Sequence, residues 1–435
     1  MGLKKNQPWL WFLVALFTMV GVFLIGPPIP DDQQTAKCVI NVRLRGPFGL
    51  SLNCDSPEFL RLATNPTGLL EWHNVRQARP GLIFAAAVVA LPLAPLRTVA
   101  AHLGVQADPG EWDPRKAAAG LANYPPAFAA YLLLNILFLV AAFSCLMRIC
   151  RPGGTPVETA IVVAAGLLLL ANHSVKYIWG PHTQIFNILA PMFGVYVAQR
   201  AWSDGLHGRG FAAAAGALTG LGLTAYALFA VIVPCLVLPA LVRSRRLRPQ
   251  EVRVRMVNLA IAVPLIALPY AAWFLFVRHR TGDFYNFEVA QYRLVVWMRD
   301  AWAQGGATLL AASLAQKLWR LIEFAAPQAI GATVMVAWAI AVPIFAGTRA
   351  QLRPALPVIG VALFVSALVA VFYTTVGMIE ARLAYATVPP LIAIAAAAGL
   401  AASRQLSPRY GWLLAAGSLV IALVQMLVIV INTNA

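Results

Sequence analysis

Long runs of apolar residues, separated by short polar stretches, make up most of the chain. A helix needs roughly 20 apolar residues to cross the hydrocarbon core of a membrane. Runs near this length occur at 9–26, 81–101, 127–147, 157–172, 183–199, 211–242, 256–277, 330–347, 355–374, 384–402 and 411–431. The run at 211–242 has room for one tilted helix or two shorter ones. The pattern therefore predicts an all-α integral membrane protein, a polytopic helical bundle of about 11 to 13 spans.

Composition agrees with this prediction. The 435 residues are 60% hydrophobic and only 11% charged, with a mean hydropathy of +0.74; soluble domains are about 45–50% apolar. We find no convincing internal repeat and no soluble domain at either end. Residues 1–435 are therefore expected to form a single polytopic membrane domain.

The formal net charge of +17 would suggest a nucleic-acid partner in a soluble protein. Here the basic residues form short clusters between apolar runs, as in the cytoplasmic loops of membrane proteins, so membrane lipids are the expected partners and nucleic acid is not. The strongest cluster, "RSRRLRPQEVRVR" at 243–255, predicts a cytoplasmic loop. Lys4 and Lys5 place the N-terminus on the same side, and the run after them lacks a small-residue cleavage site, which predicts an uncleaved anchor in the cell inner (plasma) membrane.

These anchors place two longer segments on the extracytoplasmic face. One is a first loop at about 30–80, and the other is the stretch 278–328, whose aromatic and arginine residues are typical of a helix lying in the membrane interface. One conflict remains, because Arg148 and Arg151 have a cytoplasmic pattern while simple alternation places them outside. Either 81–101 does not fully cross the membrane or the charge rule fails locally.

The first outer loop contains two cysteines, Cys38 and Cys54. An oxidising compartment would permit a disulfide between them. Two free thiols are an equally good interpretation, since the sequence does not give their separation.

The stretch "CDSPEFLRLATNP" in the same loop has a tightly spaced acidic pair, Asp55 and Glu58. Its "SPEFLRLA" portion predicts a helix with proline at its first position, and Asp55 would precede that helix near the membrane surface. A carboxylate there could remove a proton from a hydroxyl group. The alternatives for Asp55 are a helix cap or a solvated loop acid.

Further candidate residues follow at three places. Arg76 and Arg79, in "HNVRQARPGL", have side chains suited to a phosphate or diphosphate, or to anchoring at lipid headgroups. His182 and Asn187 interrupt an apolar region, where polar groups normally face a cavity or a partner; they are expected to line a site or to bind helix backbone. No spacing of histidines and acids forms a metal signature, so no metal or other cofactor is expected.

Near the end of the chain, "YTTVGMIEARLAYATVPPL" places Glu380 and Arg382 at the start of an apolar helix. They could form an ion pair between neighbouring helices. Alternatively, Arg382 could contact the phosphate of a lipid-linked substrate.

Taken together, these features resemble the polytopic C-type glycosyltransferases (the GT-C fold), including the protein mannosyltransferase and aminoarabinose transferase relatives. The resemblance lies in an uncleaved first helix, the acid in the first outer loop with a downstream "RP", the "HTQIFN" segment, and an arginine before a late "PPL" helix. It implies transfer of a sugar from a polyprenyl-phosphate-linked donor to a lipid or glycan acceptor outside the membrane, with inversion at the anomeric carbon.

By this resemblance Asp55 is the general base, Arg382 and Arg79 bind the carrier phosphate, and His182 lines the sugar pocket. Many members of the family have "DE" where this chain has "DS", with the second acid displaced to Glu58. Three other functions compete: a transporter or flippase of a lipid-linked or amphiphilic solute, a surface-polysaccharide polymerase or ligase with its essential charges around Arg278, Arg280 and Arg293, and a structural assembly protein.

Overall fold

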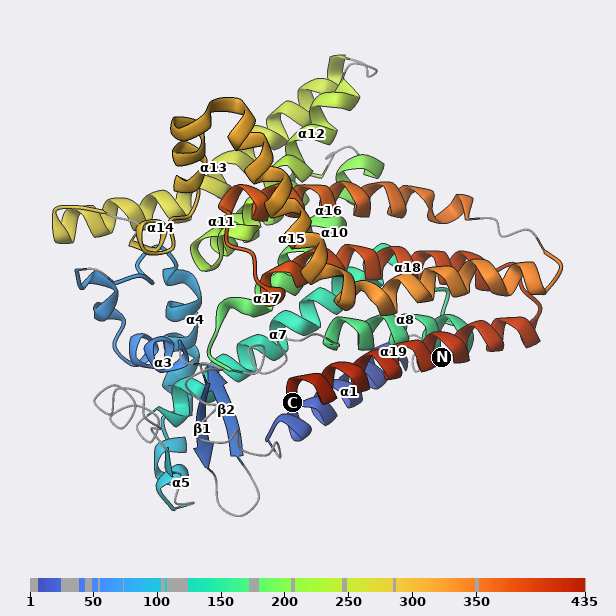
Figure 1. Cartoon of the computed structure of the whole chain (residues 1–435), viewed down its shortest axis with the longest axis horizontal. Coiled ribbons are helices and arrows are strands. Elements are labelled where there is room, and N and C mark those ends of the chain that lie inside the picture. The colour runs from blue at the N-terminus through green and yellow to red at the C-terminus, as the bar shows by residue number, and fades with distance from the viewer. Residues whose placement is uncertain are drawn as a thin grey trace.

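Helices make up most of the structure, a computed structural model, and one small sheet lies at one end (Figure 1). The structure describes residues 7–24, 39–43, 49–53, 55–72, 74–102, 106–107, 124–171, 180–204, 208–244, 249–284, 287–348 and 352–434. The proposed pair Cys38 and Cys54 lies outside these residues.

Six helical segments of the described chain are long and apolar enough to cross a membrane. They are α7 (Pro125–Cys150), α13 (Pro249–Thr281), α15 (Val296–Phe345), the η7–α16 segment (Arg353–Val376), the α17–η8–α18 segment (Ala381–Ser403) and the first part of α19 (Pro408–Asn434). Within these segments, α16 is Leu356–Val376 and α18 is Val388–Ser403. Shorter apolar helices include α1 (Gln7–Leu24) and α8 (Pro156–Leu170). The chain is a helical membrane protein.

The long apolar run at 211–242 forms two helices. α11 (Arg209–Ala225) ends at Tyr226, whose backbone is extended, and the 3₁₀ helix η6 (Ala227–Val231) leads into α12 (Ile232–Ser244). Of the two possibilities that the sequence allowed, the structure has the pair of shorter helices.

Small residues let α11 approach α13 closely. A Cβ atom added at Gly216 would lie 2.6 Å from the carbonyl oxygen of Ala262 on α13. Gly220, one turn further along α11, faces the same helix at the Leu265 and Ile266 carbonyls. Glycines spaced by four residues are a common device for close helix packing in lipid, where no hydrophobic effect drives helices together.

Replacing Gly216 with leucine is therefore expected to destabilise the protein by about 1–3 kcal/mol, because the side chain would force α11 away from α13. The matched control is Gly210→Leu on the same helix, where an added Cβ meets no atom within 4 Å. Thermal unfolding of the detergent-purified variants measures both. Equal melting temperatures for the two variants would contradict the close packing.

Side-chain hydrogen bonds define two opposite ends of the bundle. At the sheet end, the Tyr131 hydroxyl donates to the Phe59 carbonyl (3.1 Å) and Trp273 Nε1 donates to the Gln77 carbonyl (2.7 Å). At the opposite end, Arg404 Nη2 donates to the Arg151 carbonyl (3.2 Å). α7 runs the length of the bundle, from Tyr131 at the sheet end to Arg151 just beyond its last turn.

The expected span at 81–101 is not a single helix. α4 (Pro80–Ala90), η3 (Leu91–Leu93) and α5 (Leu96–His102) replace it, with Pro92 and Pro95 at the breaks because proline cannot continue the backbone hydrogen bonding. The following strand β3 (Gln106–Ala107) pairs antiparallel with β1 (Val39–Arg43), which also pairs with β2 (Gly49–Asn53).

This pairing returns the chain to the sheet end before α7 begins. Residues 80–107 therefore start and finish at the same end and do not cross the bundle, so α7 carries Arg148 and Arg151 to the opposite end. Of the two explanations for the position of Arg148 and Arg151, this geometry favours a segment at 81–101 that does not fully cross the membrane.

The expected boundary of the second outer segment, at residue 328, falls inside a helix. α13 continues to Thr281, the short α14 (Phe287–Gln291) follows, and α15 runs to Phe345 with a kink at Gly305 and Gly306. The end of the second outer segment near residue 328 stays a prediction, because α15 is much longer than one membrane crossing and continues through that position.

Candidate active site

Asp55 lies between β2 and the helix α3 (Ser56–Thr64) at the sheet end. Pro57 occupies the first turn of α3, as the sequence predicted, but the Asp55 side chain makes no capping hydrogen bond to that helix. Its backbone N–H donates to Asn53 Oδ1 (2.8 Å), and its side chain is 32% exposed. The carboxylate is therefore partly accessible and engaged elsewhere than in capping.

Two basic side chains from distant parts of the chain converge on this carboxylate. Arg76 Nη2 lies 2.9 Å from Asp55 Oδ1, and His182 Nε2 lies 3.4 Å from Oδ2. The Arg76 guanidinium is only 7% exposed and lies over the Phe59 ring, 4.8 Å from its centroid. The same ring contacts the His182 imidazole, with 5.6 Å between centroids. Phe59 thus holds both partners against Asp55.

The protonation states follow from these contacts. Burial alone would raise the pKa of Asp55, but the hydrogen bond from His182 and the charge of Arg76 outweigh it and hold that pKa well below its usual range. Burial lowers the pKa of His182 to about 4, against the opposing effect of Asp55. At neutral pH the carboxylate is therefore ionised and the imidazole neutral. Since a carboxylate only accepts, His182 Nε2 carries the hydrogen.

The neutral state of His182 predicts acid sensitivity. Its pKa is about 4 in the folded protein, whereas an exposed histidine has a pKa of about 6.5, so the unfolded chain binds more protons between these values. Stability should therefore fall as the pH drops from about 6.5 to 4, by up to roughly 3 kcal/mol. The measurement is thermal unfolding of the parent and of His182→Gln across this pH range. The glutamine still offers an N–H to Asp55 but does not titrate, so the stability of the variant should depend less on pH. Parallel curves for parent and variant would contradict the assignment.

Arg382 approaches the same group from the late part of the chain. It lies on α17 (Ala381–Ala384), and its Nε pairs with Glu380 Oε2 at 2.5 Å. This ion pair is therefore within one short segment and does not join neighbouring helices. The charge of Arg382 also favours the ionised form of Asp55 and the neutral form of His182. The structure thus brings Arg382 near the Asp55 cluster.

Asn187, on α10 (Phe186–Asp204), fixes the position of α17. Its Nδ2 donates to the Arg382 carbonyl (3.0 Å), and its Oδ1 accepts from the Tyr373 hydroxyl (2.7 Å). Tyr373 in turn lies 3.2 Å, hydroxyl to hydroxyl, from Tyr226. Sequence reasoning missed both tyrosines. Each lies near the end of a mostly apolar helix, and this position of a polar hydroxyl group could have indicated a role for it. Asn187 binds backbone, one of its two expected roles.

Arg79 belongs to a different ion pair. Its Nε donates to Glu288 Oε2 on α14 (2.7 Å), Nη2 contacts the other carboxylate oxygen, and Nη1 reaches Thr183 Oγ1 (3.4 Å). Both side chains are largely buried, with 17% exposure for Arg79 and 9% for Glu288. Burial lowers the pKa of Arg79 to about 10, so it stays charged at neutral pH. Arg79 thus fixes α14 to the start of α4, and its contact with a carrier phosphate stays a prediction.

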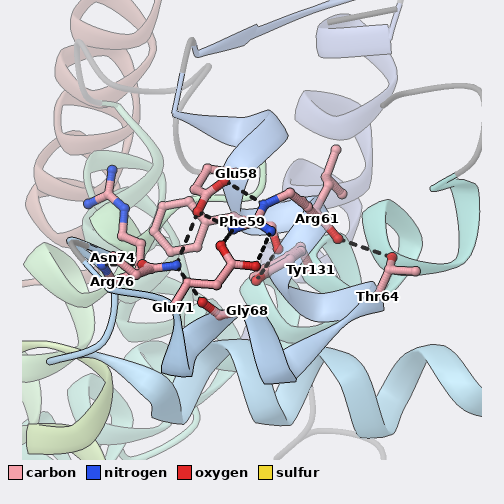
Figure 2. Close-up of polar contacts among 10 residues, drawn as sticks. Glu58, Phe59, Arg61, Thr64, Gly68, Glu71, Asn74, Arg76 and Tyr131 are labelled. Atoms are coloured by element: carbon pink, nitrogen blue, oxygen red, sulfur yellow. Dashed lines mark hydrogen bonds and ion pairs between the residues drawn. The ribbon is translucent and has the colours of Figure 1, made fainter. Parts of the chain in front are cut away.

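Glu58 takes part in a network on the exposed side of α3 (Figure 2). Its two oxygens accept from Arg61 Nε (2.9 Å) and Nη2 (3.0 Å), and one also accepts from Asn74 Nδ2 (3.4 Å). Arg61 pairs with Glu71 as well. Asn74 Oδ1 accepts from the Arg76 backbone N–H (2.8 Å). Glu58 therefore supports the loop that carries Arg76, and a contact between Glu58 and substrate stays a prediction.

Within the described residues, no group of three or more histidine, cysteine or acidic side chains is placed to hold a metal ion. The chain matches no protein family, no curated protein and no solved structure.

Proposed function

We propose that this protein is a GT-C-like membrane glycosyltransferase, which moves a sugar from a polyprenyl-phosphate carrier to a lipid or glycan acceptor on the extracytoplasmic face. The observation that carries the proposal is the ionised carboxylate of Asp55, partly accessible, held by buried Arg76 and neutral His182 and lying near the cationic Arg382. An enzyme of this kind needs a fixed base and a fixed positive charge close together at the membrane surface.

The reaction assigns each group a role. The acceptor hydroxyl oxygen attacks the anomeric carbon, and its proton passes to the Asp55 carboxylate. The bond between the anomeric carbon and the phosphate oxygen breaks, and its electron pair leaves with the polyprenyl phosphate. Arg382 stabilises the negative charge on that leaving group. Attack on the face opposite the phosphate inverts the anomeric carbon.

The low pKa of Asp55 makes it a weak base in the absence of substrate. Part of that depression comes from positive neighbours, Arg382 among them. A donor phosphate bound at Arg382 would offset this charge and raise the proton affinity of Asp55. Donor binding would thus activate the base only when a sugar is present to be transferred.

The connectivity supports a specific membrane arrangement within this proposal. With 80–107 confined to the sheet end, crossings by α1, α7, α8, α10, α11, α12, α13, α15, α16, α18 and α19 give about 11 spans, the lower bound of the range expected from apolar length. A cytoplasmic N-terminus then places the sheet end and Asp55 outside. It also places Arg148, Arg151 and Arg404 on the cytoplasmic side of an inner membrane, in agreement with the charge rule.

The test is transfer of a labelled sugar from membrane polyprenyl-phosphate pools by the purified protein, compared with its Asp55→Asn variant. Transfer that depends on Asp55 supports the proposal. Absence of transfer, together with solute-dependent flux in proteoliposomes, would favour the transporter. The break at Tyr226 does not favour it, because the break is a turn between α11 and α12 and not a gap within one helix.

A further inference from the structure

A cavity of about 770 Å³ lies at the end of the bundle opposite Asp55. It is bounded by the last turn of α7, the end of α10, the first half of α16 and the end of α18. Its walls are mostly apolar and include Leu356, Val361, Phe364 and Leu400. Its volume falls within the usual range for small-molecule sites, roughly 300–1,000 Å³. None of the residues assigned to the proposed reaction lines it.

Two arginines give this cavity a cationic edge. Arg151 and Arg404 both line it, and among the residues that the structure describes no acidic side chain does. Arg404 Nε donates to the buried carboxylate of Glu158 (2.8 Å), yet its side chain remains 49% exposed. The exposed Arg151 side chain has no acidic partner among the ion pairs of the described residues. The cavity thus combines an apolar wall with a net positive rim.

The backbone at Arg151 adds a second observation. This residue ends α7 in the left-handed conformation, with φ of 48°. Glycine normally occupies this position at a helix end, because other residues pay a penalty of roughly 1 kcal/mol there. An arginine at such a position is consistent with a use for its side chain beyond ending the helix.

We infer that this cavity binds one anionic phospholipid, with its phosphate at Arg151 and Arg404 and an acyl chain along α16. A soluble anion would not need the apolar wall, and an uncharged lipid would not need the arginines. The position suits a lipid, because α16 begins here and its Leu356 and Gly360 face outward. Basic pockets between helix ends are recognised sites for acidic lipid headgroups. The inference does not depend on the proposed sugar transfer.

The chain offers a variant that fills the cavity without a clash. Gly360 lines the cavity, and an added Cβ there meets no atom within 4 Å. Gly360→Trp would therefore occupy the space while both arginines remain. Arg151→Asn instead leaves the cavity open and removes one of its two positive charges. Asparagine tolerates the left-handed conformation at this position. Gly21→Trp on α1, also with an open Cβ position, is the matched control.

The experiment titrates the detergent-purified full chain with dioleoylphosphatidylglycerol, dioleoylphosphatidylcholine or inorganic phosphate. Thermal unfolding gives the melting temperature, and native mass spectrometry gives the number of bound lipids. The parent and Gly21→Trp should bind one phosphatidylglycerol and gain roughly 2–5 °C, with much smaller effects of the other two probes. Gly360→Trp should lose the shift and the bound lipid, and Arg151→Asn should lose the preference for phosphatidylglycerol. If Gly360→Trp does not fold, Gly360→Leu replaces it.

An unchanged phosphatidylglycerol shift in both the cavity-filling and the Arg151 variants would overturn the inference. An equal response of the parent to inorganic phosphate would replace the lipid with a soluble anion, and an equal response to phosphatidylcholine would show that the arginines do not select the ligand.

Discussion

Replacing Asp55 with asparagine is expected to reduce sugar transfer by a factor of roughly 10²–10⁴, the usual contribution of a general base. Asparagine has nearly the same shape, and its Oδ1 still accepts from Arg76, but an NH2 group replaces the oxygen that faces His182, and the amide does not take a proton from the acceptor hydroxyl. The loss should therefore appear in the rate at saturating donor and acceptor. The measurement is transfer of a labelled sugar at matched expression, with melting temperature recorded alongside.

The control for this change is Glu71→Gln, which neutralises a carboxylate in the same loop. Glu71 is 55% exposed and pairs with Arg61, outside the Asp55 group, so its loss should leave transfer nearly unchanged. Equal rates for Asp55→Asn and the parent would remove Asp55 from the chemistry. An equal loss in both variants would indicate that the loop, and not the base, had been damaged.

The sequence suggests the candidate residues one at a time but not their pairing. Asp55 is a candidate as a loop carboxylate at a helix start, Arg76 and Arg382 as arginines suited to a phosphate, and His182 as a polar group in an apolar region. Which side chain meets which depends on contacts between residues far apart in the chain. The ion pair of Arg79 with Glu288 spans 209 positions, and no local pattern indicates it. Glu288 itself stood in a segment noted only for its aromatic and arginine residues.

The helical membrane character was predictable because the length and hydropathy of each run decide it locally. The segment 81–101 shows the limit of that approach. Its residues are apolar enough to cross a membrane, yet Pro92 and Pro95 break it and two residues of β3 return it to β1. Hydropathy measures the affinity of a segment for lipid and not the path of the chain. It therefore does not distinguish a helix that crosses the bundle from short helices that stay at one end.

The Arg79–Glu288 pair leads to the largest expected effect on stability. Arg79→Met or Glu288→Gln alone should destabilise the protein by about 3–5 kcal/mol, because either change leaves one largely buried charge without its partner. Denaturant or thermal unfolding of the detergent-purified protein measures the loss. The comparison pair is Arg293 with Asp300, at the same end of the molecule. Arg293 is 71% exposed, so Arg293→Gln should leave the melting temperature nearly unchanged.

A double variant separates the pair from its surroundings. Arg79→Met combined with Glu288→Met removes both charges, so its destabilisation should be smaller than the sum of the single losses, with a coupling of roughly 1–3 kcal/mol. Additive losses would mean that the two side chains act independently. The same variant bears on function, since α14 would no longer be fixed to Arg79 by charge. If Arg79 only positions α14, apolar packing of the two methionines should take over that role and the double variant should retain transfer, whereas a phosphate ligand at Arg79 would require that arginine itself.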